Sequence, residues 1–205
     1  MPRNRRVWNP NIFNHIVMRG NNRQNIFNDT KDFIEFFRTL SYTYEKYPFT
    51  IASYCVMTNH YHLLLLSPKV HISKIMHLIN RRYSYYYKKK YDYSGHLYEN
   101  RYFSELIHTP KAMLTVSRYI HRNPINTKTP MVEKMENYPY SSYSLFKYNQ
   151  PSPFPFVDTN SLLDCLQYPT LQTREDYLNF CETEVESIIG ENPQNHTHQK
   201  HFSKL

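Results

Sequence analysis

The amino-acid sequence predicts an α+β fold in which helices pack on a small antiparallel sheet. Three observations support this fold class: four short segments typical of β-strands, three segments with apolar residues at helical spacing, and the order in which these elements alternate. The chain has 205 residues, which is enough for one well-packed domain and an appendage.

Four segments rich in apolar and aromatic residues are predicted as strands: residues 12–19, 49–57, 60–66 and 101–108. The first strand ends at a Gly-Asn-Asn turn signal over residues 20–22, and Pro68 ends the third strand. Only Thr58 and Asn59 separate the second strand from the third, so we expect these two strands to form a hairpin.

Three segments are predicted as helices: residues 30–46, 71–90 and 109–122. Asp29 can cap the first helix, and Pro48 stops it. The second helix has one apolar face and ends in a stretch of arginine, lysine and tyrosine residues. The third helix begins at Thr109-Pro110, a preferred cap followed by a proline at the first helical position. It ends before Pro124, because a residue that precedes proline disfavours the helical conformation.

The predicted order is β-α-β-β-α-β-α. Its first six elements have the order of a ferredoxin-like or RRM-like sandwich, an antiparallel sheet with helices on one face. The third helix is then free to cross the open face or an edge of the sheet. We assign residues 1–150 to this domain, 151–192 to an acidic helical extension and 193–205 to a disordered tail. The extension starts with a proline-rich linker over residues 151–160, followed by short helices over 162–166 and 177–189.

Positive charge is concentrated in the predicted domain. Residues 1–150 contain 22 lysines and arginines against 9 acidic residues, whereas residues 151–192 contain one arginine against eight acidic residues. Together with the 20 tyrosines of the chain, this basic body suits a nucleic acid, because cations contact phosphates and aromatic rings stack on bases. A basic protein without a polyanionic partner is the alternative.

The sequence favours a cytoplasmic, nucleoid-associated protein without a membrane partner. No apolar stretch reaches the roughly 20 residues that a membrane-spanning helix needs. The basic N-terminus is not followed by the apolar core of a signal peptide. Cys55, Cys165 and Cys181 are an odd number without metal-site spacing, so we expect reduced, buried thiols.

His60 and His62 are the first candidate functional pair. Successive side chains of a strand alternate between its faces, so these two histidines project from one face and Tyr61 from the other. Two neutral imidazoles in this arrangement can share one divalent metal ion. The alternative is that one histidine is a core residue and the other is exposed.

Tyr119 and Asn123 are the second candidate pair. They lie four residues apart in the third helix and therefore share one helix face, beside the apolar stripe. The phenol of Tyr119 can serve as a nucleophile, and the oxygen of Asn123 suits Mg²⁺ or Mn²⁺ as a third ligand. The alternatives are a packing tyrosine and a helix C-cap. Capping and metal binding by Asn123 are compatible.

Nine basic residues are expected to contact DNA: Arg19, Arg23, Arg81, Arg82, Lys88, Lys89, Lys90, Arg101 and Arg122. Five of them fall within residues 81–90, a tyrosine-rich stretch that contains no acidic residue. The alternatives for this stretch are a solvated helix end and an apolar stripe with a cationic rim.

Five segments of the chain resemble, in order and spacing, the single-tyrosine HUH transposase family, and within it the REP-associated tyrosine transposase-like proteins. They cover about residues 1–148 and comprise 18–23 (MRGNNR), 56–64 (VMTNHYHLL), 95–102 (GHLYENRY), 118–124 (RYIHRNP) and 138–143 (YPYSSY).

This resemblance implies that His60, His62 and Asn123 bind Mg²⁺ or Mn²⁺ and that Tyr119 attacks a DNA phosphate. The products are a 5′-phosphotyrosine link and a free 3′-hydroxyl, and the substrate is single-stranded DNA next to a hairpin. We expect the metal to stabilise the departing oxygen, and the local positive field to favour the phenolate form of Tyr119. A monomer or a homodimer is compatible with the sequence.

The sequence thus predicts a metal-dependent single-stranded DNA endonuclease and strand transferase of the transposase type. Two alternatives remain open. One is a nucleic-acid-binding module that carries out no chemistry. The other is an HUH nuclease of the replication-initiation or conjugation type, which differs in its DNA substrate and its joining step.

Overall fold

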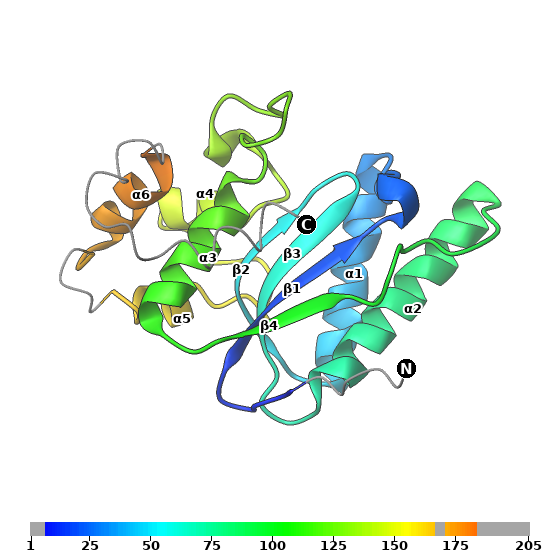
Figure 1. The fold of residues 1–205 in the computed structure, drawn as a ribbon, viewed down its shortest axis with the longest axis horizontal. Coiled ribbons are helices and arrows are strands. Elements are labelled where there is room, and N and C mark those ends of the chain that lie inside the picture. The colour runs from blue at the N-terminus through cyan, green and yellow to red at the C-terminus, as the bar shows by residue number, and fades with distance from the viewer. Residues whose placement is uncertain (1–6, 167–170, 184–205) are drawn as a thin grey trace.

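A four-stranded antiparallel sheet forms the centre of the protein (Figure 1). Its strands are β1 (Phe13–Arg19), β2 (Thr50–Val56), β3 (His60–Leu66) and β4 (Phe103–Ile107). They lie side by side in the order β2-β3-β1-β4, the ferredoxin-like arrangement that the sequence predicts. The computed structural model describes residues 7–166 and 171–183. Each predicted strand is present within two residues of its predicted bounds.

Two helices, α1 (Thr30–Lys46) and α2 (Ile72–Tyr91), cover one face of the sheet. Their apolar stripes pack on the inward side chains of the strands in an aromatic-rich core that includes Phe36 and Tyr83. Both helices match their predicted bounds within one residue, because their caps and periodicity are local signals.

The opposite face of the sheet is covered by α3 (Pro110–Arg122), together with shorter helices that follow it. Figure 1 shows α3 on the side of the sheet away from α1 and α2. Of the two positions that the sequence left open for this helix, the open face and an edge of the sheet, the structure shows the open face. The shorter elements are α4 (Tyr143–Lys147), α5 (Asn160–Leu163), α6 (Arg174–Glu182) and the 3₁₀ turns η1 (Asn21–Arg23) and η2 (Met135–Asn137). The sequence did not predict α4 or the two 3₁₀ turns, which are too short to show a period.

The proline-rich segment 151–160 packs against the sheet, whereas the sequence predicted a linker. Phe156 is buried, and its backbone oxygen accepts a 2.7 Å hydrogen bond from the backbone N–H of Ile51 in β2. Phe154 stacks on Phe37 of α1. Aromatic residues between the prolines supply this packing, which a composition-based reading of the segment overlooks.

The helices of the extension start earlier than predicted. α6 begins at Arg174 because Thr173 and Asp176 form a reciprocal capping box. The end of the predicted helix 177–189 and the predicted tail 193–205 lie outside the described residues. Within residues 7–166 and 171–183, no helix is long and apolar enough to cross a membrane. Cys55 and Cys181 are buried and Cys165 is partly buried, all as free thiols.

A buried carboxylate joins the start of α1 to the end of α2. The side chain of Asp32 is fully buried and accepts hydrogen bonds from the hydroxyls of Tyr86 and Tyr91 and from the ammonium of Lys90. Burial alone would raise the pKa of Asp32, but these donors and the backbone N–H of Asn28 outweigh it, and the pKa is lowered. The carboxylate is therefore held ionised.

Asp32→Asn should lower the free energy of unfolding by about 2–3 kcal/mol at pH 7, because Lys90, Tyr86 and Tyr91 lose a charged acceptor. The folded-state pKa of Asp32 is depressed, so its contribution to stability is fully present above the ordinary carboxyl pKa of ~3.9. That stability is lost as the pH falls from there through the lower folded-state pKa. Urea denaturation at pH 7 and at pH 3 measures both effects. Asp29→Asn is the matched control, because Asp29 contacts the same lysine from an exposed position and should matter much less. Equal losses for the two variants would contradict this prediction.

Candidate active site

β3 places two histidines on the face of the sheet that α3 covers. His60 pairs with Arg19 at the end of β1, and His62 follows two residues later on the same face, as strand alternation predicts. Tyr61 projects from the opposite face, where it is fully buried and donates a 2.7 Å hydrogen bond to Asn80 of α2. Because β3 is an inner strand, both histidines are flanked by neighbouring strands, at the end of the sheet where β3 begins.

α3 brings Tyr119 and Asn123 to the same place. Its apolar stripe packs on the sheet and leaves Tyr119 partly buried above the histidines. The ring of Tyr119 lies 5.4 Å from that of His62 and is nearly perpendicular to it. The carboxamide oxygen of Asn123 lies 3.3 Å from Nε2 of His60. The four residues that the sequence singled out for metal binding and catalysis therefore form one cluster.

Both ring nitrogens of His60 face carboxamide oxygens. Nδ1 lies 2.6 Å from Oδ1 of Asn59, and Nε2 faces Oδ1 of Asn123. Asn59 donates through Nδ2 to the backbone oxygen of Arg23. Asn123 donates through Nδ2 to that of Tyr119, so hydrogen bonds orient both amides. A neutral imidazole carries only one N–H, so only one of its two nitrogens can donate to the amide oxygen that it faces. At the other nitrogen, the lone pairs of nitrogen and oxygen face each other. A cation bound between those two atoms would satisfy both.

His15 lies beside His62, and the sequence reasoning missed it. Its Nε2 lies 3.0 Å from Nδ1 of His62, and the two rings stack with centroids 5.2 Å apart. Nε2 of His62 is buried and has no hydrogen-bond partner among the described residues. A buried ring nitrogen without a partner fits a metal ligand. Strand alternation in the sequence does place His15 on the same face of β1 as Arg19. The sequence does not show, however, that β1 pairs with β3 and so brings that face beside His62.

The donors that could hold a divalent ion are two imidazole nitrogens, from His60 and His62, and the carboxamide oxygen of Asn123. Within the described ranges, no three His, Cys, Asp or Glu side chains gather as a metal site. An ion at this position would therefore depend on Asn123 for the third protein ligand. This donor set combines borderline nitrogen with a hard oxygen.

Burial keeps the imidazoles neutral. It lowers the pKa of His60 to about 4; the Asn123 amide opposes this shift, and the charge of Arg19 adds to it. Burial also lowers the pKa of His62 well below its ordinary value, and the neighbouring His60 and His15 add to the effect. The lone pairs that a metal ion requires are therefore available at neutral pH.

The phenol of Tyr119 departs from the sequence-based expectation. Burial raises its pKa, and the charge of Arg19 and the amide of Asn123 oppose the shift only in part. The positive charge of Arg19 acts in the expected direction, but in the protein alone desolvation outweighs it, and the net effect disfavours the phenolate. Ionisation of Tyr119 at neutral pH needs additional positive charge.

Two of the nine basic residues expected at DNA have partners inside the protein. Arg122 is only 7% exposed, and its guanidinium donates a 2.7 Å hydrogen bond to the backbone oxygen of Cys181. Lys90 forms ion pairs with Asp29 and Asp32. Both charges connect helices: Arg122 joins α3 to the end of α6, and Lys90 joins α2 to the start of α1. The other seven are the better candidates for DNA contact.

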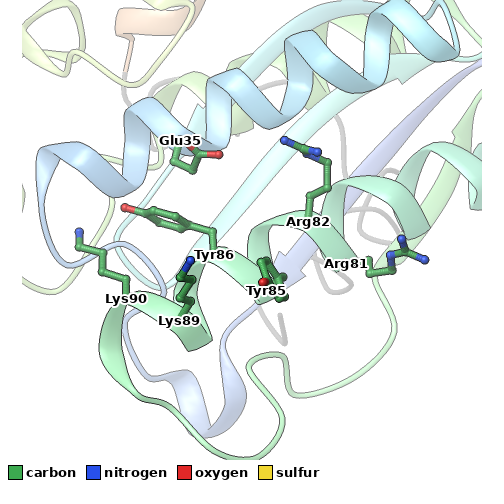
Figure 2. A pocket seen from close by; sticks show the side chains of 7 residues that line it. All are labelled: Glu35, Arg81, Arg82, Tyr85, Tyr86, Lys89 and Lys90. Atoms are coloured by element: carbon green, nitrogen blue, oxygen red, sulfur yellow. The ribbon is translucent and has the colours of Figure 1, made fainter.

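Several of the remaining basic residues surround two open grooves beside α2. The first groove, of about 810 Å³, lies between α1 and α2 and is shown in Figure 2. It is lined by Glu35, Arg81, Arg82, Tyr85, Tyr86, Lys89 and Lys90. The guanidinium of Arg82 lies 3.9 Å from the ring centroid of Tyr42. The second groove, of about 1040 Å³, is lined by Arg81 and Lys88 of α2 and by residues 95–102, which include Arg101.

The second groove reaches the end of the sheet that carries the histidines. The backbone N–H of Glu99 donates to the oxygen of Arg19, and that of Asn21 donates to the oxygen of Leu97. The segment 95–102 therefore runs beside the end of β1, where Arg19 pairs with His60. The second groove thus ends beside β1, close to the strand position that pairs with His60.

α6 packs on the outer side of α3. The hydroxyl of Tyr177 lies 2.7 Å from Oγ of Ser117 and 2.9 Å from Nδ1 of His121. Arg118 donates a 2.6 Å hydrogen bond to the backbone oxygen of Phe180, and Arg122 donates to the residues that follow. The last carbonyls of a helix carry partial negative charge, so the arginines fit this end of α6. The extension therefore braces the turn of α3 that carries the candidate nucleophile.

Comparisons with known proteins identify the family and the fold. The family described as "Transposase IS200 like" matches residues 9–123. A Haemophilus influenzae protein described as "Putative REP-associated tyrosine transposase" is 30% identical over 125 residues, which cover 55% of this chain and 69% of the relative. A solved structure of a REP-associated tyrosine transposase bound to a REP hairpin superposes with a TM-score of 0.62 at 16% identity. The match covers 78% of this chain and 93% of that one, and at this identity it establishes the fold alone.

The chain belongs to the IS200-like transposase family, because the family match spans more than half of it and includes both histidines, Tyr119 and Asn123. The resemblance to REP-associated tyrosine transposases that the sequence motifs indicated is confirmed.

Arg122→Ala should destabilise the protein, because three backbone oxygens at the end of α6 lose a charged donor. We expect a loss of about 2–3 kcal/mol in the free energy of unfolding. Arg38→Ala, which removes an exposed arginine of α1, should change it by less than about 0.5 kcal/mol. Urea denaturation compares the two variants. An Arg122→Ala protein as stable as wild type would show that this side chain does not brace α3.

Proposed function

We propose that this protein is a metal-dependent endonuclease and strand transferase that acts on single-stranded, hairpin-associated DNA through a 5′-phosphotyrosine intermediate. The observation that carries the proposal is the convergence of two imidazoles, a carboxamide and a phenol, from β3 and α3, in a member of a transposase family. The fold relative bound to a REP hairpin supports the substrate class.

His60, His62 and Asn123 would hold the ion, Mg²⁺ or Mn²⁺. When bound, such an ion supplies positive charge to the scissile phosphate and to the departing 3′ oxygen. The contribution of the protein is pre-organisation. Burial keeps the two imidazoles neutral, and the hydrogen bond from Asn123 to the backbone of Tyr119 aims the amide oxygen at His60.

Tyr119 supplies the nucleophile. Its phenolic oxygen forms a bond to phosphorus while the bond from phosphorus to the 3′ oxygen breaks. The phenol loses its proton and the departing oxygen gains one, which leaves a 3′-hydroxyl. Burial raises the pKa of Tyr119, whereas the charge of Arg19 and the amide of Asn123 lower it, so these two residues favour its ionisation. Attack of a 3′-hydroxyl on the phosphotyrosine reverses the step, so rejoining requires no ATP.

DNA would follow the basic path beside α2. Arg81, Lys88 and Arg101 line the second groove, which reaches the end of β1 next to Arg19. Tyr85 is 71% exposed between the arginines and lysines of the first groove, where its ring is available for stacking on a base (Figure 2). Phosphate contacts along such a path position the strand without reading its sequence.

Tyr119→Phe should abolish formation of a covalent DNA adduct and leave DNA binding intact, because phenylalanine keeps the packed ring but lacks the attacking oxygen. The measurement is incubation with a pool of labelled single-stranded hairpin DNAs and Mn²⁺, resolved on a denaturing gel. A wild-type adduct that is absent from the variant identifies the nucleophile and the reaction class together.

Two further variants control this experiment. Tyr148→Phe alters a tyrosine that is 56% exposed beyond α4 and should form adduct at the wild-type level. His60→Ala should bind DNA but form no adduct, because phosphate and base contacts supply most of the affinity. If wild type binds the DNA pool and never forms an adduct, the non-catalytic binding module is the better description. An adduct in Tyr119→Phe would assign the nucleophile to another residue.

Arg81→Ala and Lys88→Ala should each weaken hairpin DNA binding and reduce the salt dependence of the affinity, by roughly one unit in the slope of log K against log salt. The affinity is measured in chelator at several salt concentrations, so that binding is separated from cleavage. Lys69→Ala is the matched control, because Lys69 is exposed just beyond the end of β3 remote from His60. A slope that neither Arg81→Ala nor Lys88→Ala changes would exclude the second groove as a DNA path.

A further inference from the structure

His15 is a buried histidine that the proposed reaction does not use. It is 0% exposed in β1, on the face of the sheet that carries His60 and His62. Its ring stacks on that of His62. It also contacts the ring of Tyr119 edge-on, with the two ring centroids 6.1 Å apart. Burying a polar ring costs desolvation free energy, and an apolar side chain would fill the same space without that cost. The presence of a histidine here therefore indicates a role for its contact with His62.

The contact between these two histidines constrains where their protons lie. Nε2 of His15 and Nδ1 of His62 are 3.0 Å apart, a distance that accommodates one shared proton. If Nε2 of His62 is to bind an ion, it must carry a lone pair, and the proton of that ring must then be on Nδ1. Nδ1 of His62 would donate to Nε2 of His15, which accepts. Metal-binding histidines commonly donate their second ring N–H to such a partner.

We propose that His15 is a positioning residue for the metal site: as a hydrogen-bond acceptor, it holds the ring of His62 in the orientation and tautomer that turn Nε2 toward Tyr119 and Asn123. The inference rests on the proposed metal dependence of the site. It adds a residue from β1 to a cluster otherwise built from β3 and α3, and it assigns to the β1–β3 pairing a role in tuning metal affinity.

The test measures Mn²⁺ binding to the DNA-free protein, with the signal of free Mn²⁺ in electron paramagnetic resonance as the readout. His15→Leu removes the acceptor and should weaken Mn²⁺ binding about 10–100-fold. His15→Gln can place an oxygen near the position of Nε2 and should recover most of the affinity. Ile16→Ala is the control for stability, because the neighbouring Ile16 belongs to the core on the opposite face of the sheet. It should destabilise the protein without changing the affinity for Mn²⁺.

The outcomes separate this inference from the proposed function. If His62→Ala abolishes Mn²⁺ binding while His15→Leu binds Mn²⁺ like wild type, the positioning role is overturned and the metal site stands. If wild type does not bind Mn²⁺, or if His62→Ala binds it unchanged, the assignment of the metal site is wrong. The positioning role of His15 is then overturned as well.

A second measurement does not depend on whether the His15 variants fold. Long-range ¹H–¹⁵N spectra of wild type with Mg²⁺ report which ring nitrogens carry protons. The expected result is a proton on Nδ1 of His62 and none on Nε2 of His15. A proton on Nε2 of His15, donated to His62, would overturn the proposal.

Discussion

The packing of α3 against the sheet is the constraint on which the candidate site depends. His60 and Asn123 are 63 residues apart in the chain, and they meet because the apolar stripe of α3 docks on the face that β3 presents. α6 holds the outer side of the same helix through Arg118 and Arg122. Displacements of about one ångström can cost an enzyme roughly 100-fold in rate, so contacts on both sides of this helix would matter if Tyr119 acts as the proposed nucleophile.

The same packing sets the electrostatics of the site. Polar rings in a desolvated layer favour their neutral forms, which makes His60 and His62 available as ligands and makes the phenol of Tyr119 harder to ionise. Desolvation causes both effects. In the proposed mechanism, the same desolvation would favour a bound cation beside the imidazoles and would make ionisation of Tyr119 depend on positive charge nearby.

The two faces of the sheet differ in composition. The face under α1 and α2 is an aromatic core, closed at one end by the buried Asp32 and its donors, and the outer surface of α2 carries basic residues along open grooves. The face under α3 holds the polar cluster. Residues 95–102, which line the second groove, run beside the end of β1, where Arg19 pairs with His60.

Local signals were enough to predict the seven main elements and the projection of His60 and His62 from one face, because caps, prolines and periodicity act over a few residues. Spacing within the third helix also placed Tyr119 and Asn123 on one side. The tertiary fold was needed to bring His15 beside His62, since strand pairing joins segments far apart in the chain. It also decided which cations face inward. Arg122 reads as a surface residue in its own helix and is buried because α6 docks over it, and no local pattern encodes that contact.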